Sequence, residues 1–263
     1  MLSMYFIIAT ISAVLTFKIR KIEKIARQKE EKEQALELYN TLLDSLAHEL
    51  KTPIATIVGS TDNLLSDSFT ISEKNKKELL AEISKASRRL NQQVENLLST
   101  SRIEAGFIQA KKEWCDINDI VSTASLRLEE DLKNFVIKLH YKKNLPLFKI
   151  DYVLLEQVLY NLIQNATKYS PEKSCIEISV NDVDGGLQIT VEDDGKGFPS
   201  NETEKVFEKF YRLKNQRTGG TGLGLSIVKG FVEAHQGKIY LQNKLPQGAK
   251  FTITIPSDKY YNS

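Results

Sequence analysis

The sequence has few cysteines and little net charge, so it offers no sign of a disulfide framework, a metal cluster or a nucleic-acid surface. Its 263 residues include two cysteines, Cys115 and Cys175, which lie far apart in unlike contexts. Such a pair predicts neither a disulfide framework nor a structural metal site, and reduced thiols in a cytosolic setting are expected. The net charge of +2 gives no support for direct binding to nucleic acid. With 41% hydrophobic and 27% charged residues, the chain should be globular.

Charge is missing altogether from residues 1–17, and Lys18, Arg20, Lys21 and Lys24 follow at once. A membrane-spanning helix needs about 20 apolar residues, with a lower limit of roughly 17, so this segment predicts a short transmembrane anchor. A signal peptide is the alternative, but its positive charge should precede the apolar run and a cleavage site should follow it. The basic cluster predicts a single-pass protein of the cell (inner) membrane, with its catalytic region in the cytoplasm.

A helix is predicted around His48, because apolar residues recur there at the a and d positions of a heptad. This seam consists of Leu36, Tyr39, Leu43, Leu46 and Leu50. With Leu43 at position a, His48 falls at f, which points away from the seam, so its ring should be exposed. Thr52 lies one turn later on the same face, and Pro53 should kink the helix. On this segment alone, an ordinary surface histidine is the alternative.

A second helix is predicted over residues 73–102, after a polar break at 66–72. Its seam consists of Leu80, Ile83, Ser87, Leu90, Val94, Leu97 and Ser101. Two antiparallel helices with one apolar stripe each cannot bury both stripes alone, whereas two copies would form a four-helix bundle. A homodimer is therefore expected.

The pattern changes after this hairpin, where Ala105-Gly106-Phe107 breaks the second helix. Helices are predicted over 117–131, 151–169 and 223–235, and strands over 136–141, 176–180, 187–192, 238–243 and 250–255. This order fits helices layered on one face of a mixed sheet. The predicted segments are an anchor at 1–17, a connecting coiled-coil helix at 18–41, a hairpin domain at 42–104, a linker at 105–115, an α/β domain at 116–258 and a tail at 259–263.

The α/β domain contains a helix with polar residues on one face, since Asn161, Asn165 and Lys168 stand at i, i+4 and i+7. Two amide oxygens and an ammonium group suit a hydrated Mg²⁺ with phosphates, because Mg²⁺ prefers hard oxygen ligands and keeps several waters. The alternative is a polar outer face on an amphipathic helix.

Two further clusters contain glycine. Asp193 follows a strand and could accept a hydrogen bond from an exocyclic amine, while Gly195 and Gly197 would allow a flat ring to approach closely. A plain acidic turn is the alternative. Residues 219–225 open a predicted helix, where N–H groups can bind an anion. They are not a Walker loop, since no Lys-Ser/Thr follows, nor a dinucleotide fingerprint, since no buried strand precedes them.

In this order, with residues 207–212 between the last two clusters, the chain resembles the sensor histidine kinases of bacterial two-component systems, which combine HisKA and HATPase_c transmitter domains. Residues 48–53 look like the H box, 161–169 the N box, 193–197 the G1 box, 207–212 the F box and 220–225 the G2 box. The stretches 112–114 and 231–235 are most similar to the Kdp-type potassium-responsive kinases, whose large input region is absent here.

The resemblance implies an ATP-dependent protein histidine kinase. Residues 42–104 would be the dimerisation and histidine phosphotransfer domain, and residues 116–258 the ATP-binding α/β sandwich of the gyrase, Hsp90, histidine kinase and MutL type. His48 would take the γ-phosphoryl group of ATP and pass it to an aspartate on the receiver domain of a response regulator. Glu49 would act as a base, and Thr52 would position a water for dephosphorylating the regulator. The alternative is a membrane-tethered scaffold or decoy partner with the same fold, which degraded boxes would favour.

The resemblance also assigns the nucleotide site. Asn165, with Asn161, would hold Mg²⁺, Asp193 would bind the adenine amine, and Lys168 and Arg212 would meet the phosphates under a mobile lid at 205–218. The predicted nucleotide-binding residues are Asn161, Asn165, Lys168, Tyr169, Asp193, Gly195, Gly197, Phe207, Phe210, Arg212, Gly220, Thr221, Gly222, Leu223 and Gly224. His140, in a predicted strand, and His235, near a helix end, are expected to be structural.

Overall fold

The computed structural model describes residues 2–66, 71–142, 144–213 and 221–261. The chain divides into two compact units, residues 1–52 and 53–263. Helix α1 (Leu2–Leu65) begins in the first unit and ends in the second, with Pro53 inside it. An anchor was predicted over residues 1–17, but no helix in the described part of the chain has both the length and the apolarity that a membrane span requires.

The first unit contains the histidine of the predicted heptad. Leu46, at position d, is buried, whereas His48, at position f, is exposed, which confirms the orientation predicted from the seam. Thr52 is also exposed, and its Oγ1 donates a hydrogen bond to the carbonyl oxygen of His48 at 3.2 Å. The two residues therefore share one face of α1, as their spacing predicts.

The second unit begins with a helical hairpin formed by the end of α1 and by α2 (Glu73–Glu104). Ser72 caps α2, since its side chain accepts a hydrogen bond from the N–H of Asn75 at 3.2 Å. Between the two helices, Ser60 Oγ donates to Glu82 at 3.3 Å. The predicted polar break is only partly visible, because residues 67–70 lie outside the described residues.

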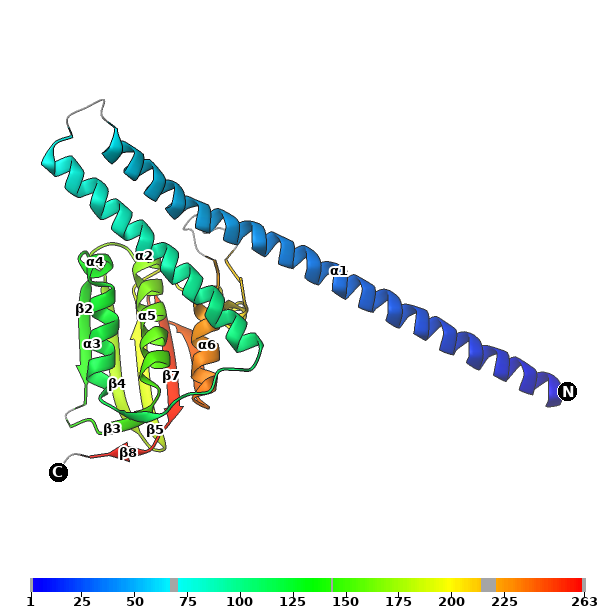
Figure 1. The fold of residues 1–263 in the computed structure, drawn as a ribbon. Helices are drawn as coiled ribbons and strands as arrows, with labels where there is room; N and C mark the ends of the chain where they lie inside the picture. Colours follow the sequence, from blue (N-terminus) through cyan, green and yellow to red (C-terminus); the bar gives the residue numbers. More distant parts are fainter. Residues whose placement is uncertain (1, 67–70, 143, 214–220, 262–263) are drawn as a thin grey trace. The chain divides into compact units, whose positions relative to one another are not determined.

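The rest of the second unit is a two-layer α/β sandwich, as predicted. A five-stranded sheet has the order β2-β4-β5-β7-β6, in which β2 and β4 are parallel and the other pairs antiparallel. These strands are β2 (Val136–Tyr141), β4 (Cys175–Val183), β5 (Gly186–Glu192), β6 (Lys238–Asn243) and β7 (Ala249–Pro256). The main helices α3 (Ile117–Arg127), α5 (Tyr152–Tyr169) and α6 (Gly224–Ala234) cover one face of the sheet (Figure 1).

The hydrophobic core lies between the helices and the sheet. Alternate residues of β7, namely Ala249, Phe251, Ile253 and Ile255, are buried, which is the period of a strand with one covered face. The helix predicted over 117–131 is in fact two helices, α3 and a short α4 (Glu129–Leu132), because the chain leaves helical geometry at the buried Leu128.

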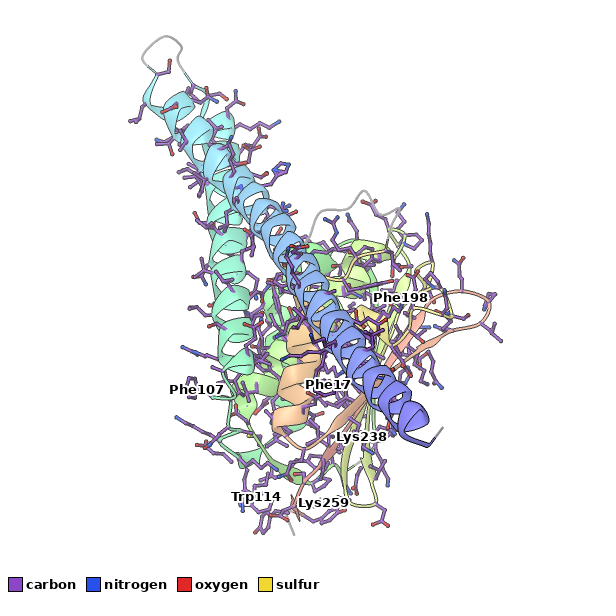
Figure 2. The ribbon with its side chains drawn as sticks, turned by 90° about the vertical axis from the view of Figure 1, so that its right-hand side faces the viewer. Phe17, Phe107, Trp114, Phe198, Lys238 and Lys259 are labelled. Carbon is purple, nitrogen blue, oxygen red and sulfur yellow. The ribbon has the colours of Figure 1, made fainter. Side chains whose placement is uncertain are left out.

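A small second sheet was not predicted. Strands β1 (Glu113–Cys115), β3 (Leu147–Ile150) and β8 (Lys259–Tyr260) pair in the order β1-β3-β8. Figure 2 shows Trp114 of β1 and Lys259 of β8 near each other at one end of the α/β domain. The rings of Trp114 and Tyr260 pack with their centroids 6.0 Å apart. Strands of two to four residues are too short to show the alternation from which strands are predicted.

One buried carboxylate, Asp151, joins three segments of this unit. It caps α5 by accepting the N–H of Leu154 on Oδ1 at 3.0 Å, and its Oδ2 accepts the N–H of Lys111 at 2.7 Å. The N–H of Asp151 in turn donates to Nε2 of the fully buried His235 at 3.0 Å, while His235 Nδ1 lies 2.8 Å from the carbonyl oxygen of Phe231. Both ring nitrogens of His235 are occupied, as expected for a structural histidine.

Candidate functional site

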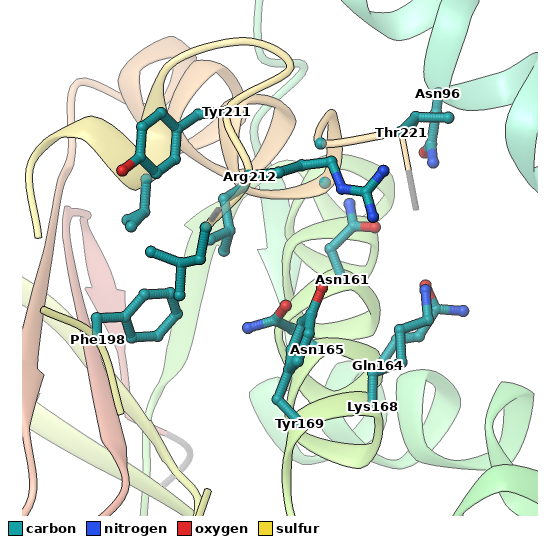
Figure 3. A pocket seen from close by; sticks show the side chains of 15 residues that line it. Asn96, Asn161, Gln164, Asn165, Lys168, Tyr169, Phe198, Tyr211, Arg212 and Thr221 are labelled. Carbon is teal, nitrogen blue, oxygen red and sulfur yellow. The ribbon is translucent and has the colours of Figure 1, made fainter. Parts of the chain in front are cut away.

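A pocket in the second unit is lined by α5, by the segment before α6 and by the first turn of α6 (Figure 3). Eight of the predicted nucleotide-binding residues line it: Asn161, Asn165, Lys168, Tyr169, Arg212, Thr221, Gly222 and Gly224. Seven further residues complete the lining: Asn96, Gln164, Phe198, Val206, Tyr211, Leu213 and Leu225. The pocket therefore gathers residues from three clusters that are separate in the sequence.

The wall formed by α5 offers amide groups and an ammonium group. Asn161 is only 6% exposed, and among the described residues its Nδ2 atom has no hydrogen-bond acceptor. A buried donor of this kind costs free energy unless a ligand or a water satisfies it. Lys168 lies two turns further on, where its Nζ donates to Gln164 Oε1 at 3.0 Å. This wall fits a hydrated Mg²⁺ with phosphates, because amide oxygens are hard ligands and the buried donor suits an anionic oxygen or a water.

The N-terminus of α6 forms another part of the pocket lining. Leu223, which precedes the first turn, provides no side-chain cap, so no cap competes for the N–H groups of that turn. Such N–H groups favour an anion. Gly222 has φ of +70°, and a Cβ atom there would lie 2.7 Å from the carbonyl carbon of Phe210. The N–H of Phe210 also donates to the Gly222 carbonyl at 3.0 Å, so glycine is required where these two segments touch.

Several predicted residues do not line this pocket. Phe207 and Leu223 are buried in the core, and Phe210 packs against the core from its edge. Gly195 and Gly197 are not among the lining residues. The predicted residue Gly220 lies outside the described residues, as do residues 214–218 of the predicted lid.

Asp193 is a buried carboxylate behind one end of the pocket. It is 4% exposed, and its Oδ1 accepts the N–H groups of Gly195 at 2.8 Å and Ala249 at 3.3 Å. Burial raises the pKa of the Asp193 carboxyl, although these two hydrogen bonds act in the opposite direction. A Cβ atom on Gly195 would lie 2.7 Å from Asp193 Oδ1 and 2.9 Å from the carbonyl oxygen of Tyr169, which lines the pocket. Gly195 thus allows the carboxylate to approach the end of α5.

Three lining residues were within reach of sequence reasoning. Gln164 stands one turn from Lys168, Phe198 directly follows Gly197, and Tyr211 lies in the predicted F box. The Tyr211 hydroxyl donates to the Glu202 carboxylate, which raises the pKa of Tyr211 to about 12. Asn96 carried no such signal, because it belongs to α2.

The predicted phosphoacceptor residues belong to the other unit. His48 and Thr52 are exposed and Glu49 is half-buried in the part of α1 that precedes Pro53, whereas every residue lining the pocket belongs to the second unit. Among the described residues, no group of three or more His, Cys, Asp or Glu side chains could hold a metal ion.

Together, the helical hairpin, the two-layer sandwich and the pocket define a nucleotide-binding domain that follows a helical domain with an exposed histidine. Comparison with known families agrees with this class. Residues 150–259 match the family described as histidine kinase-, DNA gyrase B- and HSP90-like ATPase, and residues 38–106 match the His Kinase A (phospho-acceptor) domain. The chain therefore belongs to the sensor histidine kinases and carries their HisKA and HATPase_c transmitter domains.

Individual relatives support the same family. The chain is 34% identical over 243 residues to the sensor protein KdpD of Clostridium acetobutylicum, covering 90% of this chain but only 27% of that protein. Among solved structures, the ShkA full-length protein in complex with AMPPNP is similar with a TM-score of 0.62 at 25% identity, over 84% of this chain and 46% of the other. The histidine kinase AdeS of Acinetobacter baumannii gives a TM-score of 0.58 at 28% identity, over 81% and 98% of the two chains.

Proposed function

We propose that this chain is an ATP-dependent histidine kinase that phosphorylates His48 and passes the phosphoryl group to an aspartate of a response regulator. The observation that carries the proposal is the pocket, which is lined both by the buried amide of Asn161 and by the uncapped first turn of α6. The similarity to ShkA, a structure with AMPPNP bound, supports an adenine nucleotide as the ligand.

The residues of the pocket suit a triphosphate with Mg²⁺. Asn161 and Asn165 would hold the ion through their amide oxygens and bridging waters. Bound there, Mg²⁺ would neutralise part of the charge that develops on the phosphates. Lys168, Arg212 and the first N–H groups of α6 would bind phosphate oxygens. Asp193 would accept a hydrogen bond from the adenine amine on its carboxylate, whose Oδ1 already accepts two backbone N–H groups.

The transfer requires a nucleophile that solvent and a second domain can reach, and His48 is exposed. A ring nitrogen of His48 would attack the γ-phosphorus, so that a P–N bond forms and the bond to the oxygen bridging to the β-phosphate breaks, releasing ADP. Glu49, the next residue, would take the proton from the other ring nitrogen. An aspartate oxygen of the regulator would then attack the same phosphorus, and the P–N bond would break.

This proposal is tested by following the label from ATP in the purified chain. Wild type should acquire an acid-labile, alkali-stable phosphoryl group, as a phosphoramidate does, and His48→Gln should acquire none. The matched control is His140→Gln, because His140 is also exposed but lies in β2, where its Nε2 atom is 3.3 Å from Glu177. That control should label normally. Equal labelling of His48→Gln and wild type would overturn the assignment.

We also propose that the chain acts as a homodimer. Large apolar side chains of the hairpin are at least 44% exposed in the single chain: Ile54, Val58, Leu80, Val94, Leu97 and Leu98. A second copy would cover them in a four-helix bundle. The single chain has a mass of 29.8 kDa, and light scattering after size exclusion should give twice this mass. The double variant Val58→Glu, Val94→Glu should give the mass of the monomer.

We further propose attachment to a membrane through residues 1–17. The proposal rests on the sequence, in which an uncharged run is followed at once by Lys18, Arg20 and Lys21. If it holds, the expressed chain should sediment with membranes and resist extraction by alkaline carbonate, and removal of residues 1–17 should release it. A chain that is extracted by carbonate would contradict the proposal.

A further inference from the structure

Asn96 lies on α2, outside the α/β sandwich, yet its side chain lines the nucleotide pocket (Figure 3). It is the one residue of the lining that comes from the hairpin within the described part of the chain. Figure 3 shows it at the same end of the pocket as Thr221, Arg212 and Asn161. These are the residues that would surround phosphate groups, so Asn96 faces the phosphate end.

A chain of hydrogen bonds fixes the direction of the Asn96 amide. Arg127 Nη1 donates to both oxygens of Glu156, at 2.9 and 2.7 Å, and Arg127 Nη2 donates to Gln92 Oε1 at 3.2 Å. Because the Oε1 atom of Gln92 accepts from an arginine, its Nε2 is the donor that reaches Asn96 Oδ1, at 3.0 Å. The side-chain oxygen of Asn96, Oδ1, thus already accepts a hydrogen bond. Within the described residues, the structure records no acceptor for its Nδ2.

The start of this chain of hydrogen bonds is anchored in the sandwich. Glu156, on α5, is 6% exposed, and the guanidinium carbon of Arg127 lies 4.4 Å from the centre of the Tyr160 ring. A buried carboxylate, two hydrogen bonds and a cation–π contact hold Arg127 in place. Since Arg127 is held, so is the amide of Gln92 that contacts it, and the orientation passes to Asn96.

The C-terminal end of α2 is also held against the sandwich. A Cβ atom on Gly230 of α6 would lie 2.6 Å from the Cδ1 atom of Ile103, so the missing side chain makes room for the isoleucine. Next to it, Lys209 Nζ lies 2.7 Å from Glu104 Oε1. Contacts on both sides of Asn96 along α2 therefore fix how closely this helix approaches the pocket.

We propose that Asn96 Nδ2 donates a hydrogen bond to the phosphate chain of the bound nucleotide, so that α2 supplies a nucleotide-binding residue. This inference rests on the proposed function. An amide N–H and a phosphate oxygen form a charge-assisted hydrogen bond, which is stronger than a bond between neutral groups. The bond joins the helix to the ligand, so a nucleotide with phosphates strengthens the docking of α2, and the docking of α2 tightens binding of the nucleotide by the same factor.

The direct test compares Asn96→Asp and Asn96→Ala with wild type. The aspartate keeps the acceptor for Gln92 but places a negative charge where the donor was. We expect AMPPNP with Mg²⁺ to bind Asn96→Asp at least about tenfold more weakly, and Asn96→Ala a few-fold more weakly, since a hydrogen bond to a charged group is worth about a decade in affinity or more. Asn91→Asp is the matched control, because Asn91 is exposed on α2 and its Nδ2 donates only to the neighbouring Glu95 within the described residues. It should bind AMPPNP as wild type does.

Isothermal titration separates the possible outcomes. AMP, which lacks the β- and γ-phosphates, should bind all these variants within about twofold of wild type, because the Asp193 end of the site is unchanged. If Asn96→Asp binds AMPPNP as tightly as wild type, the inference is wrong. If wild type itself does not bind AMPPNP, the proposed function fails instead. Equal weakening of AMP and AMPPNP would make Asn96 a purely structural residue and would also overturn the inference.

A second test addresses the coupling to docking. Glu104→Lys places a second cation opposite Lys209. In the otherwise wild-type chain it should weaken AMPPNP binding, because α2 then docks less readily. In the Asn96→Ala background the same change should have little effect, since the bond that couples helix and ligand is already gone. Such non-additivity is what a shared contact produces. Fully additive effects would contradict the coupling.

Discussion

Asn243 holds the main chain of Phe198 at both of its polar groups. The N–H of Phe198 donates to Asn243 Oδ1 at 2.8 Å, and Asn243 Nδ2 donates to the Phe198 carbonyl at 2.7 Å. Asn243 is the last residue of β6, and Phe198 lines the pocket while its ring packs edge-on against Phe251 at 6.0 Å. One side chain of the sheet thus sets the position of the glycine-containing turn at the nucleotide site.

Replacing Asn243 by alanine should therefore weaken nucleotide binding and lower stability. Two hydrogen bonds of about 0.5–1.5 kcal/mol each are lost, so we expect a loss of about 1–3 kcal/mol in the free energy of unfolding. The stability and the nucleotide affinity of Asn243→Asp should lie between those of wild type and Asn243→Ala, because the aspartate can accept from the Phe198 N–H but cannot donate to the Phe198 carbonyl. Thermal unfolding and titration with AMPPNP measure both effects. Gln242→Ala, at the exposed neighbour on β6, is the control and should behave as wild type.

Asp193→Asn should separate stability from binding. Burial raises the pKa of Asp193, so the folded state binds this proton more tightly than the unfolded state does. The charged form therefore costs stability, and that cost grows as the pH rises through the unfolded and then the folded pKa. The nucleotide-free variant should unfold at a higher temperature than wild type at pH 7, with a smaller difference near pH 4. Its affinity for ATP should nevertheless fall at least about tenfold, because a charge-assisted hydrogen bond is lost.

The preference for ATP over GTP is a second test of the proposed role of Asp193 in binding the adenine amine. GTP presents a carbonyl oxygen where ATP presents an amine, so wild type should bind GTP poorly. Equal affinities for ATP and GTP in wild type would remove Asp193 from base recognition.

Asp194, the next residue, should show the opposite dependence on pH. Burial alone would raise its pKa, but hydrogen bonds from Lys244 Nζ and from the N–H of Cys175, each at 3.1 Å, lower it. A carboxyl group whose pKa is lower in the folded state adds stability at pH values above its pKa in the unfolded state. This stability disappears as the pH falls through the pKa of the folded state. Asp194→Asn should thus lower the unfolding temperature at pH 7 but have little effect below about pH 3. Asp184→Asn, in the exposed turn after β4, is the control. A pH-independent difference for Asp194→Asn would exclude the carboxylate as the cause.

Thr52 should affect only one of two activities. Its hydroxyl donates to the His48 carbonyl on an exposed face of α1, and a hydroxyl group can also hydrogen-bond and position a water. Thr52→Ala should keep the labelling of His48 but slow dephosphorylation of the regulator about tenfold or more, because the water is no longer positioned. Thr52→Ser should restore the rate. If labelling and dephosphorylation fall together in Thr52→Ala, the hydroxyl only supports the helix.

Regular elements were predictable because their patterns are long. The strand 136–141 was expected from periodicity and has the predicted ends. The helix predicted over 151–169 ends at Tyr169 as expected and begins at Tyr152, because Asp151 is its cap. The clusters of the pocket could be found because each lies on one short segment. Asp194 was interpreted only as part of the predicted G1 box, since its partners Lys244 and Cys175 come from distant parts of the chain.

Asn96 could not be found for a related reason. The pattern of α2 describes its apolar seam, and Asn96 is not part of that seam. Which polar residue of α2 meets the sandwich depends on how α2 docks, and neither periodicity nor spacing contains that information.

The position of Asp151 has a mechanical consequence. Its Oδ2 holds the main chain of Lys111, in the segment that connects α2 to α3, while its Oδ1 caps α5. A force applied along the connecting segment therefore acts first on the N-terminal turn of the helix that carries Asn161 and Asn165. Pulling Lys111 away would free Oδ2 of Asp151, while Oδ1 would still cap α5 and His235 would still hold the Asp151 backbone. Asp151 therefore couples the connecting segment mechanically to α5, the helix whose amide side chains line the nucleotide pocket.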